Sequence, residues 1–77
     1  MKDDRERKLW LVVEVALESR MFAQGDGEKA AIRRARGLAF LDMGHKFELI
    51  SDQEHQRLGD ALLAKEGDET AFLDMLD

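Results

Sequence analysis

The feature that most constrains this 77-residue chain is a broadly apolar run from Lys8 to Ala23. Apolar residues recur in it at steps of three and four, the spacing that brings side chains to one side of an α-helix. The most regular stripe, which we expect to supply the core and a dimer contact, consists of Trp10, Val13, Leu17 and Met21. Further apolar residues border this stripe, and a helix this broadly apolar is usually buried on more than one side.

A β-strand is the alternative for residues 11–15, where β-branched side chains favour a pleated surface. Length decides for the helix, because no glycine or proline precedes Gly25 and a typical strand has only about 5–6 residues. The sequence Gly25-Asp26-Gly27 then predicts a tight turn, since glycine readily adopts positive φ. Such a short connection makes the next helix an antiparallel neighbour of the first.

The second helix is predicted over residues 28–43, with Gly44 as its C-terminal cap. Its apolar side consists of Ile32, Ala35, Ala39 and Met43. Gly37 lies in the helix interior, where glycine is about 1 kcal/mol less favourable than alanine. We therefore expect Gly37 to allow another helix to approach closely.

The residues Ser51 and Glu54 match the capping box that opens a helix. This third helix is predicted to run to about Lys65, before Gly67 stops it, and Asp68 can begin a short C-terminal helix. We therefore predict an all-α fold in one domain of residues 1–77: an antiparallel helical hairpin, a third helix across it and a short C-terminal helix. A domain of this size has a small core, and without cysteine it has no disulfide, so we expect a homodimer.

Charge divides the chain into unequal halves. Residues 1–37 hold nine Lys/Arg and seven Asp/Glu, whereas residues 38–77 hold three and ten, which accounts for the net charge of −5. An acidic surface attracts basic protein surfaces and repels phosphate backbones. The residues that we expect to present it to a basic partner protein are Asp60, Glu66, Asp68, Glu69, Asp74 and Asp77. Solubility is the alternative explanation of this charge.

The C-terminal segment also carries the apolar residues Phe72, Leu73 and Leu76. An amphipathic segment of this kind can dock in the groove of a partner protein. The alternative, which we favour, is that it packs on its own domain or on a second copy as a closing helix.

No catalytic, metal or nucleotide motif is present, so we expect no enzymatic activity and no cofactor. His45 and His55 are too few for a zinc site unless Asp42 or Asp52 joins them. Ser51 is already used by the capping box, which leaves a Ser-His-Asp arrangement without a suitable nucleophile.

Nucleic-acid binding is the main alternative function, because Arg33, Arg34 and Arg36 cluster in a helix that follows a turn. The acidic balance of the chain and the lack of interleaved aromatic residues argue against it. A third alternative is a purely structural assembly subunit.

The segments 36–40 and 50–58, an Arg-Gly-aromatic helix and an Ile-Ser-Asp-Gln-Glu helix start, resemble small helical proteins of phage and prophage accessory regions. The resemblance implies an inhibitor of host machinery, of the kind that includes anti-CRISPR proteins, and it transfers no site residue. We therefore expect a non-enzymatic, cytoplasmic protein-binding or inhibitory module. No run of about 20 apolar residues exists, so we expect no membrane span.

Overall fold

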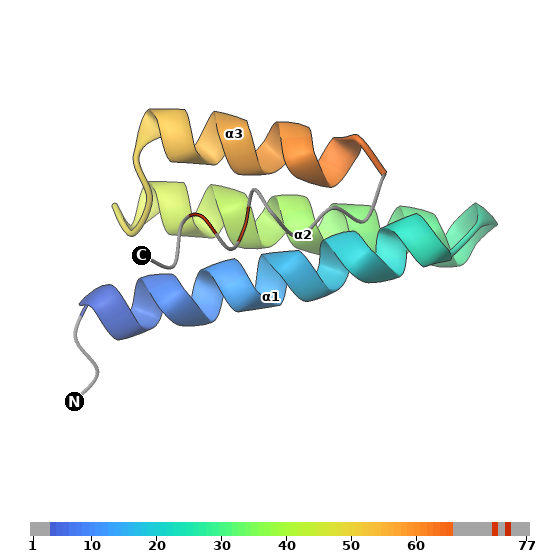
Figure 1. The fold of residues 1–77 in the computed structure, drawn as a ribbon, viewed down its shortest axis with the longest axis horizontal. Coiled ribbons are helices and arrows are strands. Elements are labelled where there is room, and N and C mark those ends of the chain that lie inside the picture. The colour runs from blue at the N-terminus through green and yellow to red at the C-terminus, as the bar shows by residue number, and fades with distance from the viewer. Residues whose placement is uncertain (1–3, 66–71, 73, 75–77) are drawn as a thin grey trace.

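The computed structural model describes residues 4–65, 72 and 74, which contain three α-helices (Figure 1). The helices are α1 (Asp4–Gln24), α2 (Gly27–Lys46) and α3 (Asp52–Leu63). Within these described residues there is no strand, and the all-α prediction is confirmed. The predicted C-terminal helix falls largely outside them. None of the three helices is both long enough and apolar enough to cross a membrane.

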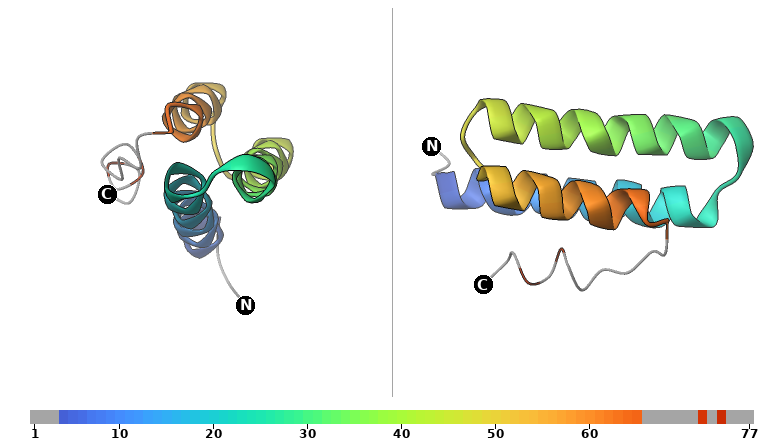
Figure 2. Two further views of the ribbon diagram at one scale, coloured as in Figure 1. Left: turned by 90° about the vertical axis from the view of Figure 1, so that its right-hand side faces the viewer. Right: turned by 90° about the horizontal axis from the view of Figure 1, so that it is seen from above.

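The three helices run side by side, and α2 points in the direction opposite to α1 and α3 (Figures 1 and 2). Seen end-on, they occupy the corners of a triangle, with α3 on one side of the α1–α2 pair (Figure 2). The connection between α1 and α2 is short because Gly27 takes a left-handed φ of 56° and the backbone N–H of Gly25 still donates to Met21. The third helix lies alongside the pair rather than across it.

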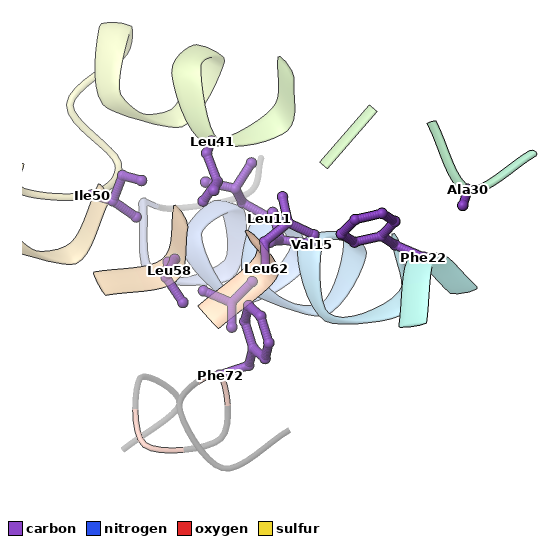
Figure 3. Close-up of a cluster of buried hydrophobic side chains, with 10 residues drawn as sticks. Leu11, Val15, Phe22, Ala30, Leu41, Ile50, Leu58, Leu62 and Phe72 are labelled. Carbon is purple, nitrogen blue, oxygen red and sulfur yellow. The ribbon is translucent and has the colours of Figure 1, made fainter. Parts of the chain in front are cut away.

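The core lies between the helices and is built from aliphatic and aromatic side chains (Figure 3). Its buried apolar residues are Leu11, Val12, Val15, Phe22, Ala30, Leu41, Ile50, Leu58, Leu62 and Phe72. The prediction that Trp10, Val13, Leu17 and Met21 form the core is wrong for the single chain, because all four side chains are exposed. The side of α1 that faces inward is instead the flank that carries Leu11, Val15 and Phe22.

Two glycines of α2 explain why that flank is buried. A Cβ atom on Gly44 would overlap the Cδ2 methyl of Leu11, and one on Gly37 would lie 2.8 Å from Cδ2 of Leu62 and 3.5 Å from Cβ of Glu18. Gly37 therefore lies where α1 and α3 both approach α2, as its interior position predicted. These two glycines let the helices pack more closely than any side chain would permit.

Gly44 is not the C-terminal cap that the sequence suggested. The helix continues to Lys46, and the left-handed position is taken by Glu48, with φ of 61°. The backbone N–H of Glu48 donates to His45 and that of Leu49 to Gly44, the hydrogen-bond pattern of a Schellman motif. The close contact with Leu11 explains why residue 44 is a glycine. The cap itself is formed two residues beyond the helix by Glu48, a residue type that the left-handed conformation disfavours.

The predicted start of α3 is confirmed. The Ser51 hydroxyl accepts from the Glu54 backbone N–H at 3.1 Å, and the Glu54 carboxylate accepts from the Ser51 backbone N–H at 2.8 Å. The helix ends at Leu63, earlier than predicted, because Lys65 already has a left-handed φ of 56°. The stop therefore precedes Gly67.

Candidate protein-binding surface

On the side of the α1–α2 pair opposite the core, both helices carry exposed or half-buried apolar side chains, and we call this surface the apolar face. Its residues are Trp10, Val13, Leu17, Met21, Ile32, Ala39, Phe40 and Met43. Phe40 is half-buried and Ala39 is exposed, while the six remaining side chains are between 37% and 52% exposed. Large apolar groups in this number and proximity are unusual on the surface of a single folded chain.

Helical geometry brings these residues together. In α1, the stripe from Trp10 to Met21 lies on the side opposite the buried flank, so the helix is apolar on two sides. In α2, Ile32 and Met43 likewise point away from the core. Trp10 and Phe40 join the two rows through an edge-to-face ring contact with centroids 5.7 Å apart.

The apolar side predicted for α2 is thus exposed, contrary to its expected inward position. Ile32, Ala35, Ala39 and Met43 all face solvent, whereas Ala30, Gly37, Leu41 and Gly44 face the core. The sequence spacing grouped Ile32, Ala39 and Met43 on one side of α2, as in the structure. It assigned them to the interior because it treated each apolar stripe as the core stripe.

A small depression lies within the apolar face on α2. It is lined by Arg36, Ala39, Phe40 and Met43 and has a volume of about 210 Å³. These positions follow the spacing i, i+3, i+4 and i+7, which surrounds a hole on the surface of one helix. A depression of this kind accommodates a single side chain of a facing helix.

The arginine cluster does not form one basic surface. Arg33 lies 3.3 Å and Arg36 lies 3.5 Å from the Glu18 carboxylate, which is buried at the α1–α2 interface. Only Arg34 of the three is exposed without an ion pair among the described residues. Because the Glu18 carboxylate offsets one positive charge and engages both Arg33 and Arg36, the three arginines do not present their full charge to phosphates.

The predicted acidic surface is described only at two of its residues. Asp60 is exposed, whereas the Asp74 carboxylate accepts a hydrogen bond from Arg57 at 3.0 Å. The other members, Glu66, Asp68, Glu69 and Asp77, lie outside the described residues. Of the predicted apolar tail, Phe72 is 1% exposed and packs against Leu62 in the core (Figure 3). Phe72 therefore packs into the core of its own chain, as the favoured alternative expected, while Leu73 and Leu76 lie outside the described residues.

The two histidines meet at the end where α2 joins α3. His45 contacts Asp52, His55 lies 2.9 Å from Asp42, and the two rings are 4.7 Å apart. Among residues 4–65, 72 and 74, no group of three or more His, Cys, Asp or Glu side chains is arranged to hold a metal ion. The two pairs connect α2 with α3.

Beside this junction, an open depression of about 630 Å³ includes His45, Lys46, Asp52 and Glu54. Burial opposes ionisation of Glu54, but hydrogen bonds from Lys8 and Ser51 and the positive charge of Lys8 outweigh it. They hold the pKa of the Glu54 carboxyl below its usual value of 4.5. The Lys8–Glu54 contact, at 2.6 Å, ties α1 to the start of α3, which gives these charges a structural role.

No protein-family model matches this sequence, and neither a curated protein nor a solved structure matches it at a significant level.

Proposed function

We propose that this chain is a non-enzymatic protein-binding module that acts through the apolar face of α1 and α2. The observation that carries the proposal is that six large apolar side chains of two packed helices are 37–52% exposed on the surface where Trp10 contacts Phe40. A contiguous apolar patch of this kind is unfavourable in water and marks an interaction site when it exceeds a few hundred Å².

The shape of this surface favours a protein over a small ligand. The depression on α2 holds about 210 Å³, below the roughly 300–1,000 Å³ of pockets that bury small molecules. The remainder of the apolar face is convex helix surface, which is suited to packing against another helix. Nucleic-acid binding receives less support, because Glu18 engages Arg33 and Arg36.

The acidic contribution to partner binding stays a prediction, as does the inhibitory role implied by the resemblance to phage accessory proteins. The net charge of −5 and the exposed carboxylate of Asp60 support a basic partner. Attraction between the acidic surface and a basic partner would speed their association and would weaken as the salt concentration rises. The apolar contact would not weaken with salt.

The test is an affinity capture in which tagged and untagged copies of the chain are produced together in source cells, and the capture is run from lysate with and without nuclease treatment. Three tagged chains are compared as baits: the wild type and the variants Leu17→Glu and Leu63→Glu. Leu17 is 49% exposed on the apolar face and Leu63 is 46% exposed on α3, so the two variants receive the same charge at similarly exposed sites. They change different surfaces, and Leu63 is also the last residue of α3, so circular dichroism must first show that both variants keep the helix content of the wild type.

We expect the wild-type and Leu63→Glu baits to retain a protein, either the untagged copy or a different chain. The Leu17→Glu bait should lose it, because a carboxylate in an apolar contact must be desolvated. Recovery of nucleic acid without any protein would contradict the proposal and favour nucleic-acid binding through Arg33, Arg34 and Arg36. Equal retention by both variants would show that the apolar face is not the binding surface.

A further inference from the structure

We infer that the partner of the apolar face is a second copy of this chain, packed face to face about a two-fold axis that runs parallel to the helices. This inference rests on the proposed function and specifies its partner. In a two-fold dimer the same patch is used twice, so one surface must carry both the projecting side chains and the recesses that receive them. The apolar face meets this requirement.

The recess is the depression on α2. Its four lining residues, Arg36, Ala39, Phe40 and Met43, have the spacing of the holes that receive side chains when two helices pack together. Ala39 contributes the smallest of the four side chains. An occupant must therefore be a helix that presents apolar side chains at matching intervals.

The projecting side chains are those of Val13 and Leu17 on α1. Trp10 contacts Phe40, and Glu18 lies 3.5 Å from Arg36. Val13 and Leu17 fall between Trp10 and Glu18, so they lie at the same height along the helices as the depression. A two-fold rotation about an axis parallel to the helices places α1 of one copy over α2 of the other at equal height. Each copy then inserts one of these two side chains into the depression of the partner.

The apolar area is also what a dimer of this size needs. Six side chains leave 37–52% of their surface exposed. Aromatic side chains bury about 150–250 Å² each, and of these six only Trp10 is aromatic, so they offer on the order of a few hundred Å² per copy. A standard interface buries about 800 Å² per partner, of which about 65% is apolar in homodimers, roughly 500 Å², an area of the same order.

Charges on the apolar face agree with this arrangement. Glu14 is half-buried beside the stripe on α1 and makes no ion pair within the described part of the chain. In the two-fold dimer, Glu14 of each copy faces the α2 segment that carries Arg36 of the other copy. The opposite charges favour this pairing at the interface.

The experiment measures the mass of the purified full chain by sedimentation equilibrium over a wide concentration range. We expect a reversible shift from 8.8 kDa to twice that mass, which persists at high salt because the contact is mainly apolar. Trp10 is the only tryptophan and lies on the apolar face, so its emission should move to shorter wavelength as the dimer forms.

Three variants locate the interface. Leu17→Glu should weaken dimerisation by about tenfold or more. Ala39→Arg should weaken it similarly by filling the depression, and Leu63→Glu should leave it unchanged. Because the mutated side chains are exposed, far-ultraviolet circular dichroism should show unchanged helix content in all three.

A wild type that stays monomeric at every concentration overturns the inference. So does a dimer that Leu63→Glu disrupts as strongly as Leu17→Glu, because it would use another surface. A monomeric chain whose apolar face still captures a different protein from lysate would overturn the second copy as partner and leave the proposed function intact. If nothing binds the face in either experiment, both proposals fail.

Discussion

The close packing of Leu11 against Gly44 makes a substitution that is normally favourable in helices unfavourable at this position. In Gly44→Ala the new methyl would overlap Cδ2 of Leu11 and lie 3.4 and 3.5 Å from its Cγ and Cδ1. The Leu11 side chain is fully buried and cannot turn away into solvent. Overpacking of this kind costs about 1–3 kcal/mol, and a direct overlap belongs at the upper end. The better helix propensity of alanine offsets about 1 kcal/mol of this cost, so the free energy of unfolding should fall by about 2 kcal/mol.

The same substitution in α3 provides the control. In Gly59→Ala the nearest atom to the new methyl would be Cδ1 of Leu41 at 4.0 Å, an ordinary contact. We expect this variant to gain about 1 kcal/mol from helix propensity alone. Gly37→Ala should fall between the two, because its methyl would lie 2.8 Å from Cδ2 of Leu62.

The measurement is urea unfolding followed by circular dichroism, at one protein concentration for all variants, with thermal melting as a second readout. For a domain of this size 1 kcal/mol corresponds to about 4–8 °C in Tm. Gly44→Ala and Gly59→Ala should therefore shift Tm in opposite directions. Combining Gly44→Ala with Leu11→Ala should cost less than the sum of the single changes, because the second substitution removes the overlap. Equal shifts for the two glycine variants would refute the packing argument.

Three further substitutions test local features of the structure. Glu48→Gly should raise the free energy of unfolding by up to about 1 kcal/mol, because glycine removes the left-handed strain at φ of 61°, and a decrease would show that this strain is absent. Ser19→Ala should raise it by about 1 kcal/mol in urea unfolding, because the buried Ser19 hydroxyl has no hydrogen-bond partner among the described residues. The Glu54 carboxylate, whose pKa is lowered in the folded chain, stabilises the fold above about pH 4.5 and loses this contribution as pH falls through its folded pKa. Glu54→Gln should therefore lower stability most at neutral pH, and a constant difference from wild type across an acid titration would contradict this assignment.

Local signals in the sequence determined where the helices lie. The turn at residues 25–27 and the capping box of Ser51 and Glu54 act over a few residues, so the sequence alone places them correctly. The ends of α2 and α3 were less predictable. Glu48 and Lys65 adopt the left-handed conformation that the sequence pattern assigns to glycine, so the positions of Gly44 and Gly67 did not mark those ends.

Which side of each helix faces the core was decided only in three dimensions. The buried side of α1 combines apolar residues with Glu18 and Ser19, and that of α2 includes two glycines, whereas the other side of each helix carries a regular apolar stripe. Periodicity within a single helix cannot tell which of its two sides faces the core. The buried side of α2 contains Gly37 and Gly44, which admit Leu62 and Leu11 at distances that no other residue allows. The buried Glu18 also finds Arg33 and Arg36 only in this orientation. Close packing and charge neutralisation across helices therefore set the core, and the more regular apolar stripes were left on the surface as the candidate binding site.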